Sequence, residues 1–186
     1  APAVRRAKQA GIIVVAMDVG AEGGVDATVT SDNIDAGALP AQYIVDKLGG
    51  KGNVVILNGP PATAIIDRVV GAREVFKKYP GIKIVSDNQN GLAQRDESYR
   101  IMGDLLTAHP EINAVFGIND PTSLGCELAI KQAGRSDISS TSVDGHPDGI
   151  EAVKQPGSFY LATAAQQIKN LGYMSMVVAM GIREGK

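Results

Sequence analysis

Residues 53–86 read NVVILNGPPATAIIDRVVGAREVFKKYPGIKIVS. The short run Asn53–Leu57 is predicted to be a strand. The amphipathic segment Ala62–Tyr79 predicts a helix, which Pro80-Gly81 ends. A second β-branched run, Ile82–Ser86, follows this helix. The stretch is therefore predicted to be a βαβ unit, in which the two strands run in parallel.

The same alternation continues on both sides of this unit. Further strands are expected at Ile12–Ala16, Ala27–Thr30, Ala114–Gly117, Ser139–Val143 and Phe159–Thr163. The first of these, Ile12–Ala16, is fully apolar, which is typical of a strand that is covered on both faces, as in a parallel sheet. Further helices are expected at Pro2–Ala10, Ile34–Leu48, Asp96–His109, Pro121–Ala133, Gly149–Lys154 and Gln167–Arg183. Strands separated by helices of this length predict an α/β fold, with three αβα layers built around a parallel sheet.

The composition excludes several classes of protein. The chain has 186 residues, of which 44% are hydrophobic and 20% charged, and this argues for a folded domain rather than a disordered one. A net charge of -2 and an aromatic content of 4%, without Trp, argue against a nucleic-acid partner. The single cysteine excludes an intrachain disulfide, and no apolar run approaches the roughly 20 residues of a membrane span.

Short polar side chains follow nearly every expected strand. The carboxyl ends of parallel strands meet at one edge of the sheet, where ligands of open α/β sheets bind. The set holds carboxylates, amides and one guanidinium without a partner histidine or cysteine, so we expect no catalysis, no metal site and no cofactor. It suits a neutral polyhydroxylated ligand, because each hydroxyl both donates and accepts. The candidates are Asp18, Asn33, Arg68, Asn119, Asp144 and Gln166.

Most candidates also have a purely structural interpretation. Arg68 lies beside Asp67 early in a helix, where the two could form an exposed charge pair. Asp144 belongs to an Asp-Gly pair of the kind that is common in turns. Asn119 precedes Asp120, which we expect to cap the following helix, and this would leave Asn119 available to a ligand.

Other polar features carry less functional information. Gln166 could simply begin a helix, and His109 lies at a helix end, where its charge would interact favourably with the helix dipole. His146 is a candidate contact at the rim of a ligand site, and Cys126 is expected to be a small core residue. The loop 58–61, Asn-Gly-Pro-Pro, lacks the glycine pattern of a phosphate-binding loop, so nucleotide binding is not expected.

Five segments together resemble a known family. They are TSDN (30–33), NGPPATAIIDR (58–68), LLTAHPEINAVFGINDPTSLG (105–125), VDGHPDGIEAV (143–153) and LATAAQ (161–166). In order and spacing they are similar to the type I periplasmic sugar-binding proteins, above all the ribose-binding branch that serves ABC importers. The resemblance implies two similar α/β lobes joined by three crossovers, with a monosaccharide held in the cleft between them.

The resemblance also implies roles for the candidate residues. Asp18 matches a carboxylate at the end of a first-lobe strand, Asn33 the hinge asparagine, and Arg68 the arginine that forks onto sugar oxygens. Asn119, Asp144 and Gln166 match further hydrogen-bonding positions. By the same resemblance, the ligand is a monosaccharide or polyol and the partner an ABC transporter permease. The location would be the periplasm, or the cell exterior with a lipid anchor.

Two positions depart from the ribose-binding pattern. Val19 stands where the ribose binders carry a second arginine, and the segment 93–94, Ala-Gln, lacks their stacking aromatic ring. Both departures favour a different sugar, such as a polyol or a hexose.

The chain is also shorter than members of this family. We expect residues 1–31 to be a remnant of the first lobe, 32–160 the complete second lobe, and 161–186 the crossover and returning helix of the first. The remainder of the first lobe would be absent or supplied by another chain. Apolar surface should then be exposed on the segments 2–17 and 167–180.

Two other functions remain as alternatives. The effector-binding core of a LacI-type transcriptional regulator shares the implied fold, and an upstream helix-turn-helix would distinguish it from a transport protein. An enzyme such as a Rossmann-type dehydrogenase would need a dinucleotide fingerprint or an acid–base pair, and the sequence shows neither.

Overall fold

A computed structural model describes residues 1–186, which form two compact units. The first unit comprises residues 1–32, 62–64 and 167–186, and the second comprises 33–61 and 65–166. The last boundary lies after Gln166 rather than after residue 160, because the chain up to residue 165 is still paired with the sheet of the second unit.

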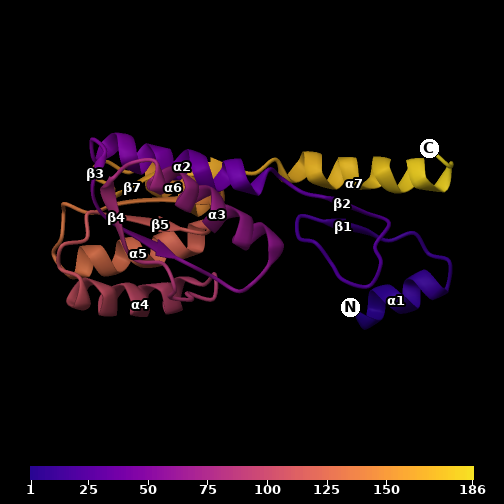
Figure 1. Ribbon diagram of the computed structural model, residues 1–186, viewed down its shortest axis with the longest axis horizontal. Helices are drawn as coiled ribbons and strands as arrows, with labels where there is room; N and C mark the ends of the chain where they lie inside the picture. The colour runs from indigo at the N-terminus through magenta and orange to yellow at the C-terminus, as the bar shows by residue number, and fades with distance from the viewer. The chain divides into compact units, whose positions relative to one another are not determined.

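The second unit is built on a five-stranded sheet of order β4-β3-β5-β6-β7 (Figure 1). Every neighbouring pair of strands in it is parallel. The strands are β3 (Lys51–Leu57), β4 (Gly81–Ser86), β5 (Ala114–Gly117), β6 (Ser139–Asp144) and β7 (Tyr160–Ala165). The helices are α2 (Asn33–Lys47), α3 (Thr63–Lys77), α4 (Arg95–Ala108), α5 (Asp120–Gln132) and α6 (Pro147–Lys154). The predicted α/β class and parallel sheet are confirmed.

Two apolar cores cover the opposite faces of this sheet. One core packs Ile44 of α2 and Phe76 of α3 against Val54, Ile56 and other strand residues. The other core packs α4 and α5 against the strand residues that point the opposite way, such as Val55 and Leu57. Because side chains alternate along β3, one strand supplies both cores. The second unit therefore has the predicted three αβα layers.

Glycines allow the helices on the first face to approach closely. A Cβ on Gly37 of α2 would lie 2.0 Å from the backbone oxygen of Arg68 in α3, and one on Gly71 of α3 would lie 2.0 Å from the oxygen of Ile34. No larger residue fits at either position, so α2 and α3 touch along their backbones. This contact fixes the position of Arg68 relative to the start of α2.

The first unit contains α1 (Pro2–Gln9), the parallel pair β1 (Val15–Met17) and β2 (Ala27–Val29), and α7 (Ile168–Arg183). The expected strand Ile12–Ala16 is correct in type, but β1 begins only at Val15. The preceding residues do not join the strand pair, because the N–H of Ile12 donates to the carbonyl of Ala7 near the end of α1. The expectation that both faces of this run are covered is wrong, since Ile12 is 55% exposed.

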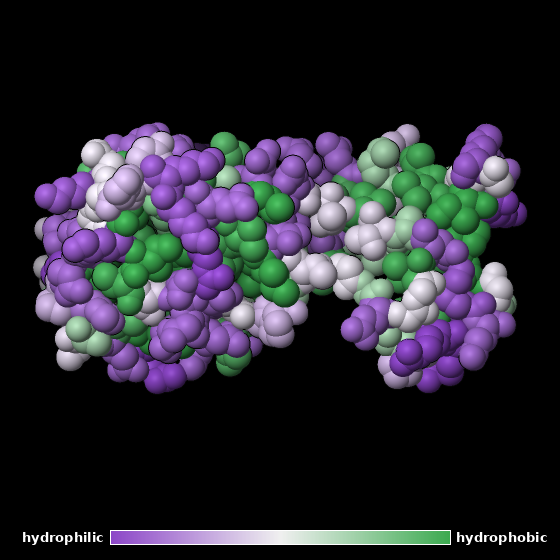
Figure 2. All heavy atoms as spheres, in the orientation of Figure 1, coloured by the Kyte–Doolittle hydropathy of each residue, from purple (hydrophilic) through white to green (hydrophobic).

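Apolar side chains are exposed along α7, as expected from the sequence. Figure 2 shows hydrophobic atoms gathered over this helix, where Tyr173 is 69% and Met176 64% exposed. Ile168, Met174, Val177 and Met180 are exposed as well. None of the helices combines the length and the apolar character that crossing a membrane requires.

Candidate ligand-binding site

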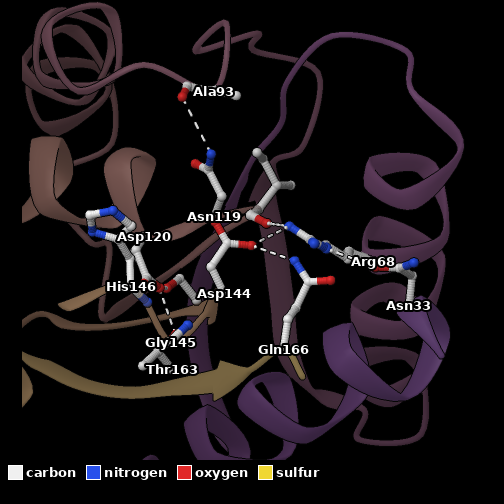
Figure 3. Close-up of polar contacts among 12 residues, drawn as sticks. Asn33, Arg68, Ala93, Asn119, Asp120, Asp144, Gly145, His146, Thr163 and Gln166 are labelled. Atoms are coloured by element: carbon white, nitrogen blue, oxygen red, sulfur yellow. Dashed lines mark hydrogen bonds and ion pairs between the residues drawn. The ribbon is translucent and has the colours of Figure 1, made fainter. Parts of the chain in front are cut away.

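Arg68 of α3 is buried and lies at the centre of a cluster of polar side chains. Its side chain is 6% exposed, and its Nε donates to Oδ1 of Asn33 at 3.0 Å. Its Nη1 donates to the carbonyl oxygen of Ile118 at 2.9 Å and to Oδ1 of Asp144 at 3.1 Å (Figure 3). The alternative of an exposed pair with Asp67 is therefore wrong. The guanidinium is held in one orientation by partners from three segments of the second unit.

Asp144 and Gln166 meet at the carboxyl ends of β6 and β7. Gln166 Nε2 donates to Asp144 Oδ1 at 3.0 Å, and the backbone N–H of Gln166 donates to the carbonyl of Asp144 at 2.8 Å. Burial raises the pKa of the Asp144 carboxyl above its ordinary value, although Arg68 and Gln166 both favour the ionised form. The cluster thus contains a carboxylate and a guanidinium that largely neutralise each other.

Asn119 lies beside this cluster but has a structural task as well. Its Oδ1 accepts a hydrogen bond from the backbone N–H of Thr122 at 3.0 Å, and its Nδ2 donates to the carbonyl of Ala93 at 3.3 Å. Asn119 is therefore the N-cap of α5, and the expectation that Asp120 takes that role is wrong. An amide retains one further N–H and one lone pair after these two bonds, so Asn119 can still contact a ligand.

Asp120 is instead fully buried at the centre of a second network, which the sequence did not indicate. Its Oδ1 accepts hydrogen bonds from the hydroxyls of Ser142, Tyr160 and Thr163, at 2.5, 2.6 and 2.6 Å. Its Oδ2 accepts from the backbone N–H of His146 at 2.6 Å. The partners come from β6, β7 and the start of α6, so only the folded chain reveals the role of this residue.

The backbone that presents Asp144 is strained. Asp144 has a φ of 129° and Gly145 a φ of 70°, both in a region that L residues rarely adopt. A Cβ at position 145 would lie 2.5 Å from the Cβ of Ala165, so glycine is required there. A non-glycine residue in such a conformation costs about 1–3 kcal/mol, and strain of this size is often found at functional sites.

Asp18 lies in the first unit, and the other five predicted residues lie in the second. It follows β1, with a φ of 69°, and its backbone N–H donates to the carbonyl of Val29 at 2.8 Å. The hydroxyl of Thr30 donates to the Asp18 carbonyl at 2.7 Å. Its Oδ1 is buried without a hydrogen-bond partner, which is costly for a carboxylate oxygen.

The single cysteine and His146 lie outside this cluster of hydrogen-bonded side chains. Burial holds the pKa of the Cys126 thiol far above its ordinary value, and Cys126 packs in the core as predicted. No group of three or more His, Cys, Asp or Glu side chains is arranged to hold a metal ion. His146 is exposed at the start of α6, and its role as a rim contact stays a prediction.

Comparison with known proteins identifies relatives of the chain. It is 38% identical over 157 residues to the xylitol-binding protein of Mycolicibacterium smegmatis, which covers 82% of this chain and 44% of that protein. It is 34% identical over 186 residues to the ribose import binding protein RbsB of Salmonella typhimurium, covering 99% of this chain and 62% of RbsB. The chain therefore spans less than two thirds of the length of either relative.

Solved structures agree with these sequence relatives. A periplasmic solute binding protein of an ABC transporter from Actinobacillus succinogenes, with bound D-allose, matches with a TM-score of 0.89 at 31% identity. A solute binding protein from Agrobacterium vitis, with bound allitol, matches with a TM-score of 0.90 at 31% identity. Both matches cover 100% of this chain, and 68% and 66% of the respective relatives. The family model of the periplasmic binding protein domain matches residues 1–186, and the chain therefore belongs to that family.

Proposed function

We propose that this chain is part of the solute-binding component of an ABC-type sugar importer, and that it binds a monosaccharide or polyol without catalysis. The observation that carries the proposal is the ion pair between the buried Arg68 and the half-buried Asp144, which lies at the carboxyl edge of the sheet beside Gln166. Asn33 and Asn119 complete the polar set in the second unit. Asp18 is proposed as a further ligand residue, because its buried Oδ1 needs a donor.

The charges of the cluster favour an uncharged ligand. The Arg68 guanidinium already donates to the Asp144 carboxylate, so neither group is left to balance a full charge on a ligand. Both side-chain bonds to Asp144 reach Oδ1, which leaves Oδ2 as an acceptor for a hydroxyl. The amides of Asn119 and Gln166 can both donate and accept. A sugar or polyol presents the hydroxyls that match such a set.

The relatives support a transport function. Their names include a xylitol-binding protein and a ribose import binding protein, and their structures hold D-allose or allitol. These names favour transport over the effector core of a LacI-type regulator. The proposal includes an ABC permease as partner and a periplasmic or lipid-anchored location, which fractionation of producing cells would check.

The proposal is tested by titration calorimetry on the protein encoded by its complete gene, with D-ribose, D-allose, xylitol and allitol as probes. At least one probe should bind with a Kd of about 10 μM or tighter, and Asp144→Ala should weaken that binding about 100-fold, because a half-buried, hydrogen-bonded charge is removed. The control is Asp137→Ala, an acidic residue that is exposed and pairs with Arg135. Absence of binding by all four probes, or unchanged affinity in Asp144→Ala, would contradict the proposal.

A further inference from the structure

The carboxylate of Asp144 belongs to a turn whose conformation depends on hydrogen bonds to residues outside the turn. Asp144 has a φ of 129°, which is unfavourable for any residue other than glycine, whereas Gly145 adopts its φ of 70° without strain. The Gly145 N–H donates to Oγ1 of Thr163 at 3.0 Å, and the His146 N–H donates to Oδ2 of Asp120 at 2.6 Å. Thr163 in turn donates to Oδ1 of Asp120 at 2.6 Å. The two amides that follow Asp144 therefore both depend on one buried carboxylate.

We propose that Asp120 is a positioning residue for the ligand site, which fixes the turn 144–146 and thereby the direction of the Asp144 carboxylate. The inference rests on the proposed function, since it assumes that Asp144 contacts the sugar or polyol. Asp120 itself is fully buried, and both of its carboxylate oxygens already accept hydrogen bonds from protein groups. It therefore acts through the turn and not by touching the ligand.

Only an ionised carboxylate satisfies all the donors around Asp120. One oxygen lies within hydrogen-bond distance of the Ser142, Tyr160 and Thr163 hydroxyls, the first two of which also bond to each other, and the other oxygen accepts a backbone N–H. An asparagine would offer a donor to one of these sites, where it would face another donor. Burial, together with the neighbouring Asp120 carboxylate, raises the pKa of the Tyr160 hydroxyl far above its ordinary value, so this group remains a donor.

The packing around Asp120 leaves it no alternative position. A Cβ on Gly149 of α6 would lie 2.3 Å from Oδ2 of Asp120, so the first turn of α6 lies directly against the carboxylate. The carboxylate is thus enclosed by β6, β7 and α6. A substitution at Asp120 must therefore displace the adjoining turn 144–146, because the closely packed groups around the side chain leave no space for it to move.

Four variants of the complete gene product separate positioning from general stability. Asp120→Asn removes the charge, and Thr163→Val keeps the side-chain shape but removes the hydroxyl that links Asp120 to the turn. Thr163→Ser retains that hydroxyl. The control is Thr141→Val, which deletes another buried strand hydroxyl, one that donates to the carbonyl of Pro40 at 3.1 Å and not to the turn.

The affinity for the tightest-binding probe among D-ribose, D-allose, xylitol and allitol is measured by calorimetry, and folding is measured by urea unfolding. We expect Asp120→Asn and Thr163→Val to weaken binding about tenfold or more in variants that are still folded, and Thr163→Ser to bind within about twofold of the parent. Thr141→Val should lose stability but retain affinity. Even if Asp120→Asn fails to fold, the three threonine variants distinguish a positioning role from a role in stability alone.

The outcomes distinguish the two claims. If the parent binds a probe and Thr163→Val binds it equally well, Asp120 does not position the site and the inference is overturned. The same holds if Thr141→Val loses as much affinity as Thr163→Val, because the effect is then one of stability. If the parent binds none of the probes, the proposed function itself fails, and this inference fails with it.

Discussion

Two aspartates of the second unit show how burial assigns different tasks to the same side chain. Asp120 is enclosed by hydrogen-bond donors on both oxygens, whereas Asp144 receives its two side-chain bonds on one oxygen. The first arrangement holds protein groups together, and the second leaves an acceptor for a ligand. Sequence position alone does not separate them, because both residues lie where the chain passes from a strand to a helix: Asp144 ends β6, and Asp120 begins α5.

The raised pKa of Asp144 predicts a definite pH dependence. A carboxyl whose pKa is higher in the folded protein than in the unfolded chain binds more protons when folded, so its contribution to stability is greatest in acid. This contribution is lost as the pH rises through the raised pKa. The free energy of unfolding of the parent, minus that of Asp144→Asn, should therefore decrease as the pH rises above the ordinary pKa of aspartate, about 3.9.

A matched control with the opposite sign is available. The hydrogen bond from Arg135 lowers the pKa of Asp137, so the difference between the parent and Asp137→Asn should increase with pH, from acid through the ordinary pKa of aspartate. Urea unfolding of the three proteins at a series of pH values measures both trends. A difference for Asp144→Asn that rises with pH would show that burial does not dominate at this residue.

At the scale of elements, glycines set how closely the helices pack. A Cβ on Gly125 of α5 would lie 2.2 Å from the backbone oxygen of Arg95 at the start of α4. By contrast, Gly103 in the middle of α4 is exposed and has open space where a Cβ would lie. The same residue type therefore has a packing role on one helix and none on the other.

We predict opposite effects of the same substitution at these two positions. Gly125→Ala should lower the free energy of unfolding by about 1–3 kcal/mol, because α4 and α5 must move apart. Gly103→Ala should raise it by about 0.5–1 kcal/mol, because alanine favours the helix and meets no neighbour. Chemical denaturation of both variants measures the two changes. Equal effects at the two positions would mean that the α4–α5 contact does not limit the space at Gly125.

The elements themselves could be predicted well from the sequence, and their ends less well. The strand Ala114–Gly117 has the predicted bounds, because turn and cap residues flank a short apolar run. The run Ile12–Ala16 is also apolar, but most of it lies outside β1. Its backbone N–H groups donate instead to the carbonyl of Ala7 and to the side chain of Asp26. The prediction that Asp120 caps α5 is wrong. Its carboxylate instead accepts hydrogen bonds from Tyr160 and Thr163, which are far away in the sequence.

At the scale of the whole molecule, the candidate site depends on the sheet more than on any single motif. Arg68, Asp144 and Gln166 are far apart in the chain, but they come together because the parallel strands deliver their carboxyl ends to one edge. This convergence could be predicted from the order of strands and helices. The choice of partners could not, because whether Arg68 pairs with Asp67 or with Asp144 depends on where α3 packs.

The central claim is that Arg68 and Asp144 hold a sugar or polyol, and a crystal structure of the complete gene product with its tightest-binding probe tests it most directly. We predict ligand hydroxyls within about 3.2 Å of the Asp144 carboxylate, and of the Arg68 guanidinium or the neighbouring side-chain amides of Asn119 and Gln166. A ligand bound elsewhere on the protein, with the Arg68–Asp144 pair untouched, would contradict the account.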